Sequence, residues 1–227
     1  HTPFNVLQYA DDIAAVASTE VALYNVVDRL SCFASQVGLR VNTNKTVVMA
    51  TSYKNAAAAS KAIEVDGVQL PVVDNFDYLG SKLCSGKGAH TEVGDRIRKA
   101  SRAFYAFRNF WVRKGTALST RLRIFDAVVL SVLLYGSGTW PVTAQDLARL
   151  KQFQCRCLRR ILAIPLSFSA ECRTHNDDVL HQAGATPIHA LLQKRRLLWF
   201  GHVQRMDASR IPRVMLYGRL PSPRPAG

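Results

Sequence analysis

The chain has 227 residues, and because 48% are hydrophobic and only 20% are charged, it is too apolar for a disordered basic tail. It carries 30 lysines and arginines against 16 aspartates and glutamates, a formal charge of +14, and its length suffices for one large domain or two small ones. The longest apolar run, residues 125–135, is too short to span a membrane, and five cysteines predict a reducing, intracellular setting rather than a disulfide framework.

The first 90 residues predict β-hairpins around one helix. Two short apolar runs within 4–18 flank two adjacent carboxylates and predict a hairpin, and apolar residues at steps of three and four predict a helix over 19–37. A β-branched strand is expected at 47–48. Asp66-Gly67 supplies the positive φ values of a tight turn within 63–70, and another strand is expected over 76–83.

From residue 91 the pattern becomes helical. Amphipathic periodicity predicts a helix over 91–111 with a cationic back, and a more buried helix over 119–135. A capping box of Thr143 and Asp146 opens a third helix, and Pro187 starts a fourth that ends near residue 206. The final stretch, 220–227, is LPSPRPAG, which predicts no packed element.

The basic charge is concentrated in the second part of the chain. Residues 1–70 contain five basic and six acidic residues, whereas residues 71–227 contain 25 and 10, which gives net charges of −1 and +15. Such a one-sided charge predicts a nucleic-acid partner, with solubility charge as the alternative.

Chemistry is expected at Asp11 and Asp12. Two neighbouring carboxylates at a hairpin tip between buried apolar strands repel each other and lose hydration, and a divalent cation would offset both costs. Paired carboxylates of this kind hold the ions of two-metal phosphoryl transfer. The alternative is an ordinary aspartate-rich turn.

Six segments, in matching order and spacing, resemble motifs of reverse transcriptases from non-LTR (LINE-type) retrotransposons, in particular the RTE-like clade. These segments are YADD at Tyr9–Asp12, GLRVN at Gly38–Asn42 with Lys45-Thr46, FDYLG at Phe76–Gly80, LLYG at Leu133–Gly136 with Thr139-Trp140, CLRRIL at Cys157–Leu162, and RRLLWFGHVQRMD at Arg195–Asp207. The resemblance implies an α+β fold. Residues 1–88 would be the C-terminal part of a polymerase palm, 89–142 thumb helices, and 143–227 a basic helical C-terminal region.

By this resemblance, Asp11 and Asp12 bind catalytic Mg²⁺ or Mn²⁺, with Tyr9 and Ala10 beside the primer terminus and template. Lys45 resembles the lysine that protonates the leaving pyrophosphate, with a solvated loop lysine as the alternative. The resemblance also implies a primer-grip hairpin at Phe76–Gly80, in which Tyr78, Leu79 and Gly80 would place the primer 3′ end, with a plain edge strand as the alternative. Arg96, Lys99 and Arg102 would contact phosphates.

The implied partners are an RNA template, a DNA primer, deoxynucleotides and the element RNA, within a ribonucleoprotein of nucleus and cytoplasm, and no membrane. A palm polymerase also needs an upstream aspartate and the fingers, which the ten residues before Asp11 cannot contain. We therefore expect a fragment of an RNA-directed DNA polymerase that is inactive alone. The alternative is a non-catalytic nucleic-acid-binding remnant or module.

Four residues could also be interpreted as a zinc set, namely Cys155, Cys157, Cys172 and His175. Two cysteines separated by one residue on a helix point about 200° apart and do not form the usual knuckle. The alternative is that Cys157 belongs to the core and the others are incidental.

Overall fold

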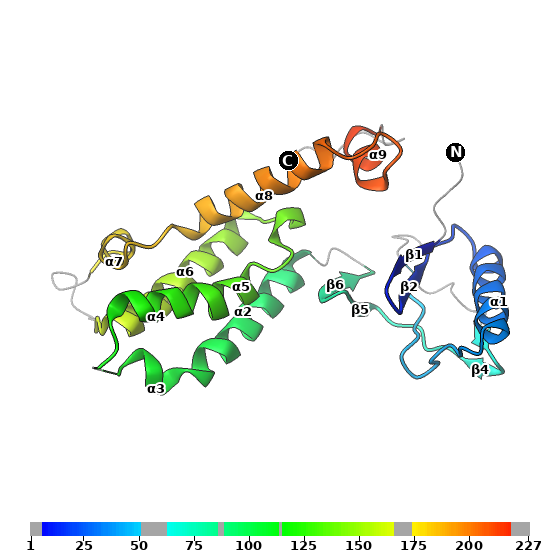
Figure 1. The fold of residues 1–227 in the computed structure, drawn as a ribbon, viewed down its shortest axis with the longest axis horizontal. Helices are drawn as coiled ribbons and strands as arrows, with labels where there is room; N and C mark the ends of the chain where they lie inside the picture. Colours follow the sequence, from blue (N-terminus) through cyan, green and yellow to red (C-terminus); the bar gives the residue numbers. More distant parts are fainter. Residues whose placement is uncertain (1–5, 51–62, 86–88, 114, 166–173, 219–227) are drawn as a thin grey trace. The chain divides into compact units, whose positions relative to one another are not determined.

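A computed structural model describes residues 6–50, 63–85, 89–113, 115–165 and 174–218 (Figure 1). It combines helices with short antiparallel strand pairs, which confirms the α+β class. The chain packs as two units, His1–Glu92 and Val93–Gly227. Within the described ranges, the helices are all too short or too polar to cross a membrane.

The first unit begins with the expected hairpin. Strands β1 (Val6–Tyr9) and β2 (Asp12–Ala15) pair antiparallel, with Tyr9 opposite Asp12, so only two residues form the turn. Ala10 takes a positive φ of 52° in that turn. The first prediction from the sequence is confirmed.

Helix α1 (Glu20–Gln36) is also confirmed, and side-chain and glycine caps define its ends. Thr19 accepts a hydrogen bond from the Ala22 amide at 3.2 Å. At the other end Gly38, with φ 75°, closes a Schellman motif, in which its amide donates to Ser35 and the Leu39 amide donates to Ala34.

The hairpin expected within 63–70 is present as β3 (Glu64–Val65) and β4 (Val68–Gln69). Asp66 and Gly67 both have positive φ, 52° and 76°, as its two-residue turn requires. The strand expected at 47–48 is wrong, because Val48 makes only an isolated parallel bridge to Val72.

The single strand expected over 76–83 is wrong as well. The chain reverses there, so that β5 (Asn75–Tyr78) pairs antiparallel with β6 (Ser81–Cys84). Leu79 and Gly80 form the turn with φ of 48° and 77°. A leucine in a left-handed turn position gives no sequence signal for a hairpin, which explains the error.

The second unit is helical. Helices α2 (Ala89–Ala106) and α3 (Arg108–Trp111) occupy the expected 91–111 span, with a break at Phe107. The expected helix over 119–135 is confirmed as α4 (Leu118–Ile124), a π-helical segment (Phe125–Leu130) and α5 (Ser131–Leu133) in succession.

Among the described residues, a 3₁₀ turn (Ser137–Thr139) follows, and then the helices α6 (Ala144–Leu162), α7 (Asn176–Ala183), α8 (Ile188–Gln204) and α9 (Ile211–Tyr217). The sequence predicted α6 and α8 but missed α7 and α9, which have 8 and 7 residues. Pro187 is the N-cap residue of α8 rather than its first helical residue. Residues 220–227 lie outside the described ranges.

One hydrophobic cluster holds the second unit together. It combines residues of the segment 89–142 with residues of the segment 143–227, and its fully buried members include Trp111, Phe125, Leu133, Leu150, Leu158, Ile161 and Ile188. Phe104 stacks on Trp111 with ring centroids 4.9 Å apart, and the Trp111 indole donates to the Phe104 carbonyl at 2.7 Å. The short helix α3 is therefore fixed to α2.

Candidate active site and nucleic-acid interface

The β1–β2 hairpin presents Asp11 and Asp12 at its tip. Asp11 lies in the turn and Asp12 is the first residue of β2, and both side chains are exposed. The flanking strands are exposed too, with Tyr9 66% and Ile13 47% accessible. The expectation of buried apolar strands around the carboxylates is therefore wrong. In the described part of the chain the two strands pair only with each other, and although β2 contacts α1, its half-buried residues are Ala14 and Ala15, away from the carboxylates.

The two carboxylates are of a kind that can bind a metal ion. Their oxygens are the donors that Mg²⁺ and Mn²⁺ prefer. Within the described residues, however, no group of three or more His, Cys, Asp or Glu side chains is placed to hold a metal ion. Asp11 and Asp12 fit a divalent cation in kind, and a complete site needs ligands from another segment.

Lys45 lies at the end of a turn, where its amide donates to the Asn42 carbonyl at 3.0 Å. The Thr46 hydroxyl donates to the same carbonyl at 2.8 Å, which fixes the turn. The Lys45 side chain is exposed. Among the described residues, the hydrogen bonds of this turn do not link Lys45 to Asp11 or Asp12, so its role stays a prediction.

Tyr78, Leu79 and Gly80 lie together at the tip of the β5–β6 hairpin. The Lys82 amide donates to the Glu92 carboxylate at 2.6 Å, which ties β6 to the first turns of α2. The hairpin is thus attached to α2 one residue pair away from its turn, and Leu79 in that turn is 38% exposed.

Arg96 is much less exposed than the sequence predicted. Its side chain is only 5% exposed, and its guanidinium carbon lies 4.6 Å from the centre of the Tyr135 ring. The reason is its position three residues after Val93 and four before Ala100, which places it on the buried stripe of α2. Arg96 therefore packs the second unit together rather than presenting its charge to solvent.

Lys99 and Arg102 are exposed, as expected. Tyr105 follows at the next step of three and is 67% exposed, with the Arg108 guanidinium carbon 4.9 Å from its ring centre. We call Lys99, Arg102 and Tyr105 of α2, together with Arg108 at the start of α3, the α2 surface. It combines cations with an exposed aromatic ring.

Several other arginines of the second unit donate hydrogen bonds to backbone carbonyls. Arg121 donates from Nη1 to the carbonyls of Trp111 and Ile161, each at 2.8 Å. Arg195 donates to Leu134 at 2.7 Å and Arg196 to Trp140 at 2.9 Å. Trp111, Ile161 and Leu134 lie in or next to the last turn of a helix, where carbonyls lack helical partners. Part of the basic charge is thus structural, which the sequence alone did not reveal.

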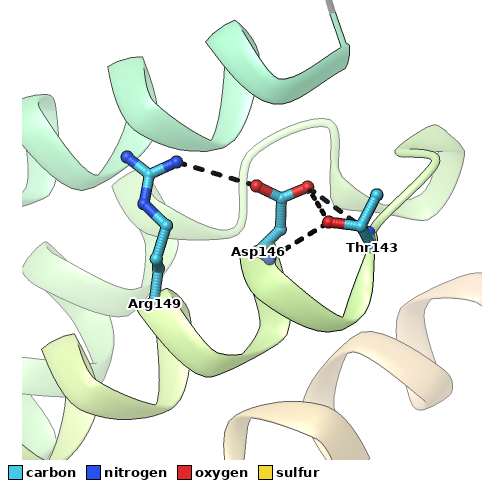
Figure 2. Close-up of polar contacts among 3 residues, drawn as sticks. All are labelled: Thr143, Asp146 and Arg149. Atoms are coloured by element: carbon cyan, nitrogen blue, oxygen red, sulfur yellow. Dashed lines mark hydrogen bonds and ion pairs between the residues drawn. The ribbon is translucent and has the colours of Figure 1, made fainter.

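The predicted capping box of α6 is confirmed (Figure 2). Thr143 Oγ1 accepts from the Asp146 amide at 3.2 Å, and the Asp146 carboxylate accepts from the Thr143 amide at 3.3 Å and hydroxyl at 2.8 Å. Arg149 lies 3.7 Å from the other carboxylate oxygen of Asp146, which is 1% exposed. The buried charge is therefore compensated.

The zinc interpretation finds no support among the described residues. Cys155 and Cys157 are both buried, and burial raises the pKa of the Cys157 thiol to about 12, which opposes the thiolate that zinc requires. His175 is exposed before α7, and Cys172 lies outside the described residues. Cys157 belongs to the core cluster, in agreement with the alternative prediction.

Comparison with known proteins identifies transposon-encoded relatives. A transposon-derived protein of Caenorhabditis elegans is 28% identical over 209 residues, which cover 92% of this chain and 75% of that protein. A 115 kDa protein in the type-1 retrotransposable element R1DM of Drosophila melanogaster is 26% identical over 190 residues, covering 79% of this chain and 18% of that protein. An RNA-directed DNA polymerase from the Drosophila transposon BS is 25% identical over 181 residues, covering 76% and 20%.

The chain is a retrotransposon-related protein. It spans about a fifth of the length of the two Drosophila relatives. No protein-family profile matches it. No solved structure matches it either.

Proposed function

We propose that this retrotransposon-related chain is part of an RNA-directed DNA polymerase of a non-LTR, RTE-like element. The observation that carries the proposal is the tight hairpin with Asp11 and Asp12 adjacent and exposed at its tip. The relation to a transposon RNA-directed DNA polymerase supports it. In this proposal residues 1–88 belong to the palm, 89–142 to the thumb and 143–227 to a basic C-terminal region.

Asp11 and Asp12 would hold Mg²⁺ or Mn²⁺ together with a carboxylate from an upstream segment of the polymerase. The bound ions would supply activation of the primer 3′-hydroxyl and stabilisation of the leaving pyrophosphate. Lys45, whose exposed amine stands on a fixed turn, would donate a proton to pyrophosphate. Tyr9 and Ala10 would lie beside the primer terminus and template.

The β5–β6 turn and the α2 surface would each contact the template–primer duplex separately. Tyr78, Leu79 and Gly80 would place the primer 3′ end, and Lys99 and Arg102 would contact phosphates. Arg96 is assigned a packing role beneath this surface because it is buried against Tyr135. The element RNA would be the template within a ribonucleoprotein.

The test is an Asp11→Asn substitution in a polypeptide that joins this chain to the upstream fingers and palm of a related polymerase. We expect primer extension on RNA with Mg²⁺ from the unsubstituted protein and a loss of several powers of ten from the Asp11→Asn protein, because the amide is a poor metal ligand. Asp28→Asn, an exposed aspartate on α1, is the matched control and should leave extension unchanged. The chain alone should not incorporate nucleotides.

A second candidate is a non-catalytic nucleic-acid-binding protein. The exposed cations of the α2 surface favour it, since they need neither Asp11 nor Asp12 to bind a duplex. Equal primer extension by the Asp11→Asn protein would contradict the metal-site assignment and favour this candidate.

A further inference from the structure

One backbone amide of the β5–β6 hairpin points away from the ribbon close to its turn. At the open end of the hairpin the Ser85 amide donates to the Asp74 carbonyl at 2.8 Å, just beyond the last strand pair. Opposed residues of antiparallel strands alternate between pairs that exchange hydrogen bonds and pairs whose amides point outward. Counted from Asp74 and Ser85, the third pair, Asp77 and Lys82, is of the second kind. The Lys82 amide therefore points outward from the edge of β6.

The side chain of Glu92 accepts this outward amide. Its Oε2 atom lies 2.6 Å from the Lys82 nitrogen, a short distance that agrees with a charged acceptor. Glu92 follows Lys82 by ten residues and lies in the first turn of α2. An outward amide on a strand edge is normally left to water or to another strand. In this hairpin a carboxylate from the next helix takes that place.

The position of Glu92 in the helix favours its charge. Glu92 is only 9% exposed, and a buried carboxylate is costly unless hydrogen bonds compensate for the lost hydration. The Lys82 amide supplies one of these bonds, and the first turn of α2 adds the positive end of the helix dipole. Both the charge of this side chain and its length therefore suit the contact.

The contact lies next to the turn of the hairpin. Only the pair of Tyr78 and Ser81 separates Lys82 from Leu79 and Gly80, whose φ angles are 48° and 77°. A leucine in the left-handed region is strained, so the form of the turn depends on what holds the strands beside it. Glu92 fixes the β6 side of this turn.

We propose that Glu92 is a positioning residue, whose carboxylate holds the β5–β6 turn in place and, through the turn, the primer 3′ end. The second part rests on the proposed function, in which Tyr78, Leu79 and Gly80 place the primer. Glu92 acts through the Lys82 amide and does not itself contact nucleic acid. A displacement of the turn by roughly 1 Å would move the primer hydroxyl out of line for reaction.

The first measurement is amide hydrogen exchange of the full chain, followed residue by residue by NMR. In Glu92→Ala, the amides of residues 78–82 should exchange roughly tenfold faster, because a hydrogen bond to a charged group is lost. Glu92→Gln keeps the length of the side chain and an acceptor oxygen, and should retain most of the protection. Glu92→Asp keeps the charge but is shorter by one methylene, and should behave like Glu92→Ala.

The matched control is Glu20→Ala, which removes the acidic residue from the first turn of α1. It should leave exchange in β5 and β6 unchanged. Unchanged exchange in Glu92→Ala, or an equal effect of Glu20→Ala, would overturn the proposal. Protection that is kept in Glu92→Asp and lost in Glu92→Gln would overturn it too, because the charge at the helix start would then matter and the hydrogen bond would not.

The second measurement is primer extension by the polypeptide that joins this chain to upstream fingers and palm. Glu92→Ala should lower kcat roughly tenfold to a hundredfold with little change in the KM for template–primer, and Glu92→Gln should recover most of the loss. An unchanged kcat, or a rise in KM alone, would overturn the primer role. If the unsubstituted polypeptide extends no primer, the proposed function fails together with the primer role, whereas hydrogen exchange still decides whether Glu92 holds the turn.

Discussion

Ala10 occupies a turn position that favours glycine. Its φ of 52° lies in the left-handed region, which costs an L-residue with a side chain roughly 1 kcal/mol. The side chain is exposed, so no packing offsets this cost. The hairpin that displays the two carboxylates is therefore strained at the residue before Asp11.

Ala10→Gly should stabilise the β1–β2 hairpin by about 0.5 kcal/mol, because relief of strain exceeds the entropy that glycine adds to the unfolded chain. Slower amide hydrogen exchange within β1 and β2 would show this. Ala14→Gly, within β2, makes the same chemical change without a positive φ and should accelerate exchange. Faster exchange in both variants would contradict the assignment of strain to Ala10.

Cys157 makes the stability of the folded protein depend on pH in the alkaline range. Burial raises its pKa to about 12, above the value of an unfolded thiol. The folded state therefore keeps the proton longer than the unfolded state, and the associated stability is complete below pH 9 and is lost as the pH rises toward 12.

In chemical denaturation between pH 8 and 11, the free energy of unfolding should fall more steeply for the unsubstituted chain than for Cys157→Ala. The difference in slope has an upper limit of about 1.4 kcal/mol per pH unit. All other groups are the same in both proteins, so their contributions cancel in the comparison. Identical slopes would show that the Cys157 thiol is not protected by burial.

At the scale of elements, the N-terminal capping box of α6 contributes separately to the stability of the fold. The Thr143 hydroxyl satisfies an amide of the first turn, and Asp146 is 1% exposed between Thr143 and Arg149. Thr143→Ala should lower the free energy of unfolding by about 1 kcal/mol, measured by thermal denaturation. Thr120→Ala, at an exposed position of α4, removes the same group without a cap and should change it by less than half as much.

Hydrophobic periodicity and turn residues predicted the helices and hairpins whose caps or turns are formed by residues close in sequence. Thr19, Gly38, the Asp66-Gly67 pair and Thr143 each satisfy a backbone requirement within a few residues, so their helices and hairpins could be read from the sequence. The β5–β6 reversal did not follow from local pattern, because Leu79 carries no turn signal, although the resemblance implied a hairpin there. Helices α7 and α9 are too short for a clear period of 3.6 residues.

In the candidate site, too, the features set by neighbouring residues could be predicted, and those set by distant residues could not. The hairpin around Asp11 and Asp12 followed from local pattern, whereas the burial of Arg96 depends on Tyr135, about 40 residues away. The carbonyl contacts of Arg121, Arg195 and Arg196 likewise join distant segments. A count of basic residues therefore overstates the charge available for nucleic acid.

At the scale of the whole molecule, the exposed cations divide among several helices of the second unit. Lys99 and Arg102 lie on α2, Arg156 and Arg160 on α6, and all four are exposed. If the α2 surface holds the duplex, the salt dependence of binding should respond to substitutions there and much less to substitutions on α6. Each neutralised phosphate contributes about 0.9 to the slope of log affinity against log salt concentration.

Lys99→Gln with Arg102→Gln should therefore reduce this slope by about 2 for a template–primer duplex, measured by anisotropy between about 50 and 200 mM salt. Arg156→Gln with Arg160→Gln removes the same charge from α6 and should leave the slope nearly unchanged. Arg96→Gln should leave the slope unchanged and lower the Tm, because its guanidinium is buried against Tyr135. Equal reductions of the slope by the α2 and α6 substitutions would mean that duplex binding depends only on the total charge of the unit. The α2 surface would then lose its assignment as the duplex site.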